Sequence, residues 1–126
     1  MASILVVDDE AAMRGVMRRA LERAGHKVAE AANGDDALAV LDKRAVDLVI
    51  TDVIMPERDG VETIREMRRR RSPAKILVIT GGGPDKRMEY LGVAEIFGAD
   101  RSLAKPFKLA RLIDVVDEML AARKSA

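Results

Sequence analysis

The sequence contains no cysteine and a single histidine, His26. The lack of cysteine excludes disulfide bonds, thiol catalysis and cysteine-ligated zinc or iron–sulfur clusters, and one histidine argues against a histidine metal site. Any metal bound by this chain therefore needs oxygen ligands. His26 follows Gly25 in a predicted turn, and we expect its side chain to be solvated.

An excess of charge of one sign is also lacking, since 22 Lys and Arg residues face 21 Asp and Glu residues. Aromatic residues make up 2% of the chain. This composition provides no overall field for nucleic acid or anionic lipid and few rings for stacking on bases. The arginine run at residues 68–71 fits the carboxyl end of a helix, where cations complement the helix dipole. We expect a protein partner, with no nucleic acid and no membrane.

No apolar run approaches the roughly 20 residues of a membrane span. The first residues also lack the basic segment and cleavage site of a signal peptide, so we expect a cytoplasmic protein. A length of 126 residues fits one domain, residues 1–126, without an output domain.

Short apolar and β-branched runs predict five strands, at residues 3–7, 27–29, 46–51, 76–80 and 101–103. Continuous apolar runs of this kind are typical of strands buried on both faces. Helical spacing of apolar residues is found at 13–21, 37–41, 61–67 and 109–120. A weaker helix is predicted at 84–97, and we expect residues 121–126 to fray. The alternation predicts an α/β sandwich with a parallel sheet and right-handed crossovers.

Ligands of such sheets bind beyond the carboxyl ends of the strands. Five polar residues follow or end predicted strands: Asp8, Asp9, Asp52, Thr80 and Lys105. Carboxylates gathered at one edge repel one another unless a cation lies between them, and Mg²⁺ favours oxygen ligands of this kind. A carboxylate can also attack phosphorus to form an acyl phosphate, while a metal ion and an ammonium group neutralise the transferring oxygens. This pattern favours phosphoryl transfer.

Four segments together resemble the response-regulator receiver domain, the CheY-like family of two-component signalling. They are ILVVDDE at residues 4–10, DLVITDVIMPERDG at 47–60, ILVITGGG at 76–83 and FGADRSLAKPF at 97–107. The resemblance covers essentially the whole chain. It implies a flavodoxin-like (βα)5 fold of three layers, with a five-stranded parallel sheet of strand order 2-1-3-4-5.

The resemblance implies a role for each site residue. Asp52 would be the phosphoacceptor. Mg²⁺, with Mn²⁺ as the alternative ion, would be bound by Asp52, by Asp9 directly, by Asp8 largely through water and by the main-chain carbonyl of Ile54. Thr80 and Lys105 would hold the phosphoryl oxygens. The Lys105–Pro106 peptide bond would be cis.

Two positions depart from the family pattern. Ser102 stands three residues before Lys105, where the family often has Tyr or Phe, so the aromatic switch is missing. Arg58 occupies a position that is usually apolar. The route by which phosphorylation reaches the surface therefore stays open.

Each motif also has an ordinary structural interpretation. Asp8 and Asp9 alone could cap a helix, Asp52 alone could be a turn residue, and Lys105 alone could be a solvated side chain. The glycines at 81–83 do not form a P-loop, because no GxxxxGK[ST] pattern is present. The presence of all four segments in order favours the functional interpretation of the set.

We predict a phosphorylation switch and not a multiple-turnover enzyme on external substrates. It would accept phosphate from a histidine kinase or a histidine phosphotransfer protein, and it would act on an unknown downstream protein or pass the phosphate on. Such domains can also catalyse their own phosphorylation and dephosphorylation. Two alternatives stay open: an aspartyl phosphatase, although the typical DxDx[TV] pattern is absent, and a constitutive binding module, suggested by Ser102.

Overall fold

A computed structural model of the protein describes residues 2–52, 60–70, 72–80 and 98–125. The strands are β1 (Ser3–Val7), β2 (Lys27–Ala31), β3 (Leu48–Asp52), β4 (Lys75–Thr80) and β5 (Arg101–Ala104). The helices are α1 (Ala11–Arg23), α2 (Gly34–Lys43), α3 (Gly60–Arg69) and α5 (Leu109–Ser125). The helix predicted at residues 84–97 lies outside the described residues.

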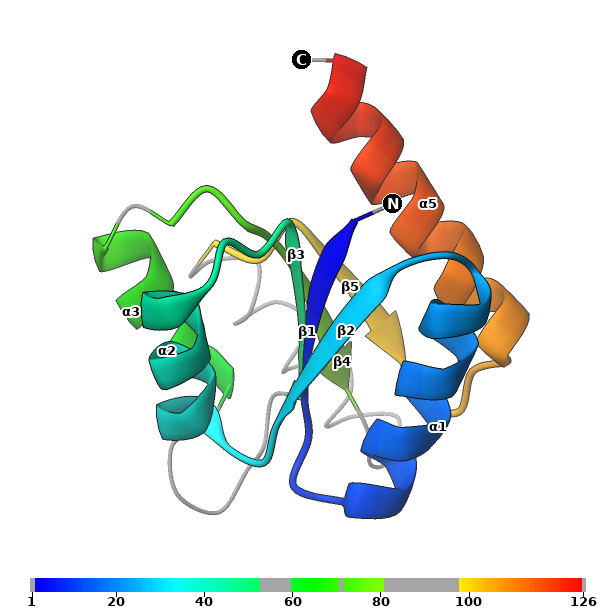
Figure 1. Cartoon of the computed structure of the whole chain (residues 1–126), viewed down its shortest axis with the longest axis horizontal. Coiled ribbons are helices and arrows are strands. Elements are labelled where there is room, and N and C mark those ends of the chain that lie inside the picture. The colour runs from blue at the N-terminus through cyan, green and yellow to red at the C-terminus, as the bar shows by residue number, and fades with distance from the viewer. Residues whose placement is uncertain (1, 53–59, 71, 81–97, 126) are drawn as a thin grey trace.

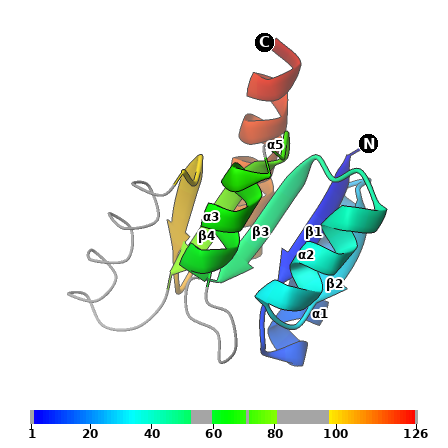
Figure 2. The same cartoon turned by 90° about the vertical axis from the view of Figure 1, so that its left-hand side faces the viewer.

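The five strands form one parallel sheet in the order β2-β1-β3-β4-β5. Helices α1 and α5 cover one face of the sheet, and α2 and α3 cover the other (Figure 1; Figure 2). This arrangement confirms the predicted three-layer fold and its strand order. The carboxyl ends of all the strands lie at the lower edge in Figure 1.

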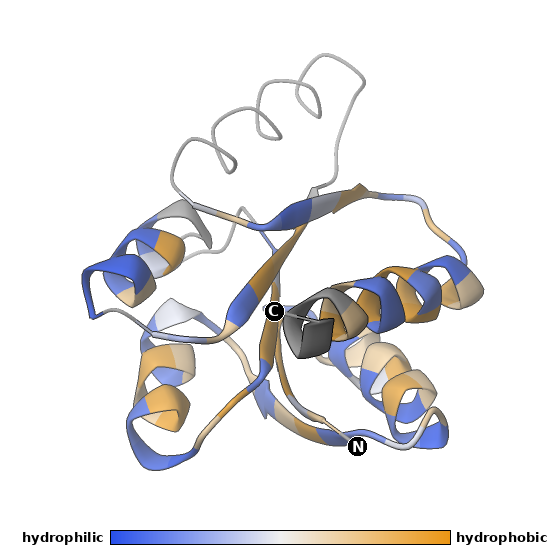
Figure 3. Cartoon of the chain, turned by 90° about the horizontal axis from the view of Figure 1, so that it is seen from above, coloured by the Kyte–Doolittle hydropathy of each residue, from blue (hydrophilic) through white to orange (hydrophobic). Residues whose placement is uncertain are grey.

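Side chains of β1 enter two different cores. Leu5 and Val7 pack with residues of α2 and α3, whereas Ile4 and Val6 pack with residues of α1 and α5. Because alternate side chains of a strand point to opposite faces, a strand covered on both sides needs apolar residues at every position. Burial on both faces is confirmed for the central strands β1, β3 and β4, which are largely apolar in colour in Figure 3, whereas the edge strands β2 and β5 are mostly half-buried.

The third strand begins later than predicted. We expected it from Val46, whereas β3 begins at Leu48. Val46 is buried, but Asp47 joins the starts of two other strands: its carboxylate accepts a hydrogen bond from the Ser3 N–H at 2.8 Å, and its carbonyl accepts one from the Lys75 N–H at 3.0 Å. The apolar character of Val46 therefore reflects core packing and not strand pairing.

The prediction that His26 is solvated is wrong, since its side chain is only 10% exposed. Gly25 adopts a φ of 96° at the end of α1, and this turn lets the His26 N–H donate to the Leu21 carbonyl. Nδ1 of the ring accepts a hydrogen bond from the Ala2 N–H at 3.3 Å, and Nε2 lies 3.7 Å from the Asp117 carboxylate. The ring therefore packs between the start of the chain and α5.

The predicted fraying from residue 121 is also wrong, because α5 continues to Ser125. One side of this helix is anchored by the buried residues Leu112, Val115, Val116, Met119 and Leu120. Alanine, arginine and lysine, which follow them, are good helix formers and favour the continuation of the helix. Neither α5 nor any other described helix combines the length and the apolar character needed to cross a membrane.

Arg68 lies in the last turn of α3, as predicted for the arginine run. Its guanidinium donates to the Gly98 carbonyl at 2.6 and 3.0 Å and lies 3.0 Å from the Asp100 carboxylate. Gly98 has a φ of 106°, and a Cβ there would come within 3.1 Å of the Arg68 side chain. Arg68 thus joins the end of α3 to the segment that leads into β5.

Leu77→Ala should lower the free energy of unfolding by about 3 to 5 kcal/mol, because Leu77 is fully buried in β4 and its truncation leaves a cavity. The same substitution at Leu109, which is 40% exposed at the start of α5, should cost less than about 1 kcal/mol. Urea unfolding of both variants measures the difference. Similar losses at the two positions would contradict the burial of β4.

Candidate functional site

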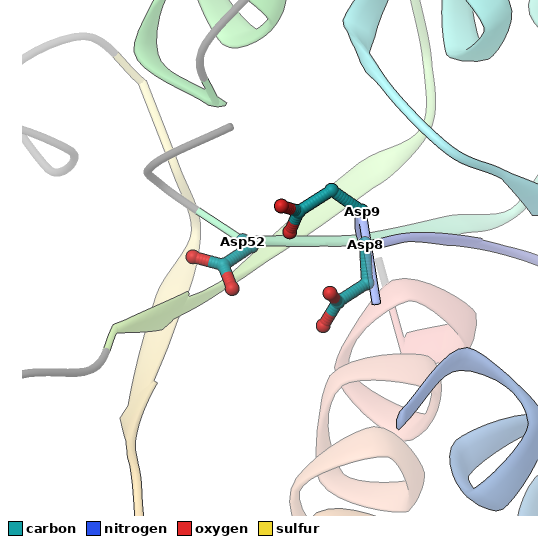
Figure 4. Close-up of side chains that lie close together, drawn as sticks. All are labelled: Asp8, Asp9 and Asp52. Atoms are coloured by element: carbon teal, nitrogen blue, oxygen red, sulfur yellow. The ribbon is translucent and has the colours of Figure 1, made fainter. Parts of the chain in front are cut away.

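The pairing between β1 and β3 determines where the candidate site residues lie. Val7, the last residue of β1, is in register with Thr51, so the residues that follow these two lie side by side at the carboxyl edge of the sheet. One carboxylate oxygen from each of Asp8, Asp9 and Asp52 lies within 4.8 Å of the other two. Figure 4 shows the three side chains gathered at the carboxyl ends of β1 and β3. The sequence prediction that these carboxylates meet is confirmed.

Asp8 is the most buried of the three, with 1% of its surface exposed. Its Oδ1 accepts a hydrogen bond from the Glu10 N–H at 2.9 Å, whereas Oδ2 is buried without a hydrogen-bond partner among the described residues. Burial raises the pKa of Asp8 above its usual value, and the nearby charge of Asp52 adds to this effect, although the Glu10 N–H opposes it. Ionisation of Asp8 therefore costs more free energy in the folded protein than in water.

Lys105 follows β5 and provides a cation beside Asp52. Its Nζ lies 3.1 Å from Oδ2 of Asp52, and both side chains are largely buried. Burial by itself lowers the pKa of Lys105, but the charge of Asp52 and the hydrogen bond to it outweigh burial and raise the pKa overall. Lys105 is therefore a firmly charged ammonium group in contact with Asp52.

The donor set fits a hard divalent cation. Three carboxylates converge, and one of them has a buried oxygen that no described donor satisfies. An ion with a preference for oxygen ligands would satisfy that oxygen and relieve the repulsion between the three charges. The cluster is thus able to bind a metal, in agreement with the prediction of oxygen ligands.

The remaining predicted site residues are placed as follows. Thr80 ends β4 opposite Ala104 of β5, so its main chain lies at the same edge of the sheet, although its side chain is outside what the structure describes. Ser102 is half-buried in β5 opposite Val78. The Lys105–Pro106 peptide bond is cis. Ile54 and Arg58 lie outside the described residues.

Arg14, which contacts the cluster segment, and its partner Glu30 were not recognised in the sequence. Arg14, in the first turn of α1, donates from Nη1 to the main-chain carbonyl of Asp8 at 2.7 Å. Its Nε donates to Glu30 of β2 at 3.0 Å. The one available signal was a basic residue at the amino end of a helix, where the helix dipole disfavours a cation.

A family model described as the response regulator receiver domain matches residues 4–117. The chain belongs to this family. Receiver domains act in phosphorelay signalling, where they accept phosphate from histidine kinases; Mg²⁺ and phosphorylation of an aspartate are general features of the family. A receiver domain is not a classic enzyme. The resemblance stated from the sequence is confirmed.

Curated relatives differ in length. The chemotaxis protein CheY of Halobacterium salinarum is 34% identical, over 94% of this chain and 97% of its own length. The sensor kinase CckA of Brucella abortus is 39% identical over 94% of this chain, but the match spans only 12% of that protein. The chain spans 47% of the transcriptional regulatory protein ResD of Bacillus subtilis.

Solved structures have the same fold. The receiver domain of NtrX from Brucella abortus shares 33% sequence identity and superposes with a TM-score of 0.86, over 94% of this chain and 98% of that one. A CheY-like receiver domain protein from Methanospirillum hungatei shares 26% identity with a TM-score of 0.90, over 99% and 98% of the two chains.

Asp8→Asn should stabilise the metal-free protein by about 1 kcal/mol or more, because an unsatisfied buried acceptor costs about 1 to 3 kcal/mol and an amide can donate to the neighbouring carboxylates. Added Mg²⁺ should stabilise the wild type and have little effect on Asp8→Asn. Thermal unfolding in EDTA and in Mg²⁺ gives both comparisons.

A carboxyl whose pKa is raised by folding binds its proton more tightly in the folded state, so the wild type loses stability as the pH rises through that pKa. The advantage of Asp8→Asn should therefore be greatest at neutral pH and shrink toward the ordinary Asp pKa of 3.8. Asp114→Asn, at an exposed carboxylate of α5, is the matched control and should change neither comparison. An Asp8→Asn variant less stable than the wild type in EDTA would refute the charge repulsion.

Proposed function

We propose that Asp52 is the phosphoacceptor of this receiver domain and that Mg²⁺ is its cofactor, with Mn²⁺ as an alternative. The observation that carries the proposal is the convergence of Asp8, Asp9 and Asp52 within 4.8 Å, with Lys105 in contact with Asp52 at 3.1 Å. A nucleophilic carboxylate, a set of oxygen ligands and an ammonium group are the parts that phosphoryl transfer to a carboxylate requires.

The metal ligands would be one or two carboxylate oxygens from Asp9 and Asp52, Asp8 largely through water, and the main-chain carbonyl of Ile54. When bound, Mg²⁺ supplies positive charge that neutralises the oxygens of the transferring group. Asp8 is the ligand that most needs this charge, because its Oδ2 is buried without a described donor.

Asp52 acts as the nucleophile. A carboxylate oxygen of Asp52 forms a bond to phosphorus while the bond from phosphorus to the donor breaks, and the donor atom keeps the electron pair. Lys105 lies close enough to bind an oxygen of the incoming phosphoryl group, and it would move its contact from the carboxylate to that oxygen. Thr80, at the end of β4, would donate its hydroxyl to another.

The donor would be a histidine kinase or a histidine phosphotransfer protein, and the phosphorylated form would bind a downstream protein or pass the phosphate on. The CheY relative of nearly the same length supports this proposal, whereas the match covers only part of the longer relatives. The single-domain organisation, the cytoplasmic location and the absence of nucleic-acid binding stay predictions.

A constitutive binding module is the second candidate, and one observation favours it. Ser102 lies in β5 where the family often has an aromatic ring, so phosphorylation lacks the usual side chain to rotate. Membership of the receiver family argues against the third candidate, an aspartyl phosphatase.

With Mg²⁺ and acetyl phosphate or phosphoramidate, the wild type should gain one phosphoryl group, and Asp52→Ala should gain none. Intact-mass measurement gives the result directly. EDTA should abolish the gain in the wild type. Asp114→Ala, a matched removal of an exposed carboxylate, should be modified like the wild type.

Equal modification of the wild type and Asp52→Ala would show that Asp52 is not the acceptor. Absence of modification from small donors and also from a histidine kinase would favour the constitutive binding module. In that case, partner binding that is unaffected by phosphodonors would support the second candidate.

Lys105→Ala should tighten Mg²⁺ binding by about fivefold, because it removes a cation that competes for Asp52 and a partly exposed pair contributes up to about 1 kcal/mol. The same variant should slow phosphoryl transfer. Calorimetric Mg²⁺ titration and the rate of mass gain measure the two effects. Lys108→Ala, an exposed lysine three residues further on, should alter neither; weaker Mg²⁺ binding by Lys105→Ala would contradict the competition.

A further inference from the structure

Arg14 lies where helix stability does not favour it. It is the fourth residue of α1, and the first turn of this helix has no acidic residue. Glu10, the N-cap residue of α1, makes no side-chain capping hydrogen bond. A cation near the amino end of a helix is opposed by the helix dipole, so the position of Arg14 calls for another explanation.

The contacts of Arg14 point to the carboxylate cluster. Side chains of a helix lean toward its amino end, and Arg14 reaches back so that Nη1 donates to the Asp8 carbonyl at 2.7 Å. Its Nε donates to Glu30 at 3.0 Å, and the Arg14 side chain is only 18% exposed. The planar guanidinium thus spans two acceptors, one on the site segment and one on β2.

Glu30 is held in place by the sheet, because it pairs with Val6 across the β1–β2 ladder. The β2 strand therefore provides a fixed anchor for Arg14. Arg18 contacts the second oxygen of Glu30 at 2.8 Å, but its side chain is 45% exposed and also pairs with Glu22. Arg18 thus shares the carboxylate with Arg14 without contacting Asp8.

Asp8 is consequently bound on both sides of its main chain. Its N–H donates to the Ala31 carbonyl of β2 at 3.1 Å, and its carbonyl accepts from Arg14. These two contacts fix the peptide groups that aim the Asp8 and Asp9 side chains at Asp52. Repulsion between the three carboxylates would otherwise push this segment away from β3.

We propose that Arg14 is a positioning residue of the metal and phosphorylation site: anchored on Glu30, it holds the Asp8 carbonyl so that the Asp8 and Asp9 carboxylates stay directed at Asp52. The expected effect of Arg14 on Mg²⁺ binding rests on the proposed function. Its contact with the Asp8 main chain does not, because that contact is present without metal.

A positioning role and a purely electrostatic role of Arg14 predict opposite changes in Mg²⁺ affinity when Arg14 is replaced. If Arg14 acted only as a nearby cation, its removal would tighten Mg²⁺ binding, because a repulsive charge would be gone. If it positions the ligands, its removal weakens Mg²⁺ binding, as loss of groups that orient metal ligands usually does by about 10- to 100-fold. Arg14→Lys keeps the charge but cannot span both acceptors, so positioning predicts weaker binding for this variant too.

The experiment compares Arg14→Gln, Arg14→Lys and the matched control Arg18→Gln. Calorimetric Mg²⁺ titration should give about tenfold weaker binding for Arg14→Gln, weaker binding for Arg14→Lys, and a change of less than about twofold for Arg18→Gln. In metal-free protein, amide hydrogen exchange at Asp8–Glu10 should be faster in both Arg14 variants and unchanged in Arg18→Gln.

Unchanged or tighter Mg²⁺ binding by folded Arg14→Gln, with unchanged amide exchange, would overturn the proposal. Equal effects in Arg18→Gln would overturn it as well, since they would reflect a general loss of ion pairs. A wild type that binds no Mg²⁺ would refute the proposed function instead, and the metal-free exchange would still decide the role of Arg14. If Arg14→Gln does not fold, Arg14→Lys provides both readouts.

Discussion

The fold and the site both depend on the parallel pairing of β1 with β2 on one side and β3 on the other. Val7 is in register with Ala31 of β2 and with Thr51 of β3. Neighbouring strands lie about 4.7 to 4.9 Å apart, so residues that directly follow paired strand ends cannot separate far. A shift of one residue would turn the apolar side chains of β1 to the wrong layers and draw Asp8 away from Asp52. Core packing therefore also fixes the spacing of the carboxylates.

The same constraint creates an electrostatic problem that the protein solves only in part. Three carboxylates and the Lys105 ammonium together carry a net charge of two negative units when ionised, which is the charge that one divalent cation neutralises. Lys105 balances Asp52, whereas Oδ2 of Asp8 has no described hydrogen-bond donor. Functional sites often keep unfavourable groups of this kind, because the ligand supplies the missing partner. A bound divalent cation would therefore relieve the unfavourable interactions at Asp8.

Much of this was predictable from the sequence, because the signals were local. Continuous apolar runs marked the strands, and the polar residue after each run marked the edge where Asp8 and Asp52 meet. The sheet order came from the resemblance, since composition alone does not order parallel strands. Side-chain contacts that depend on the packing of helices and turns could not be predicted: the Arg14–Glu30 pair depends on how α1 lies across β2, and the burial of His26 depends on the turn at Gly25.

The phosphorylation chemistry and the route of the signal depend on different parts of the fold. The proposed chemistry needs the ends of β1, β3 and β5, where Asp8, Asp52 and Lys105 meet. In contrast, the aromatic relay of the family depends on a ring at position 102. The serine at this position is too small to replace such a ring.

Two cations, Lys105 and Arg14, connect the site to other elements of the fold. Lys105 continues directly from β5, and Arg14 connects the Asp8 main chain to Glu30 on the edge strand β2. A change in the charge of Asp52 acts on Lys105 at 3.1 Å, and a change in the position of Asp8 acts on Arg14 at 2.7 Å. Serine at position 102 removes none of the groups that the proposed chemistry uses, so the output of the proposed switch would depend on the elements that contact these two cations.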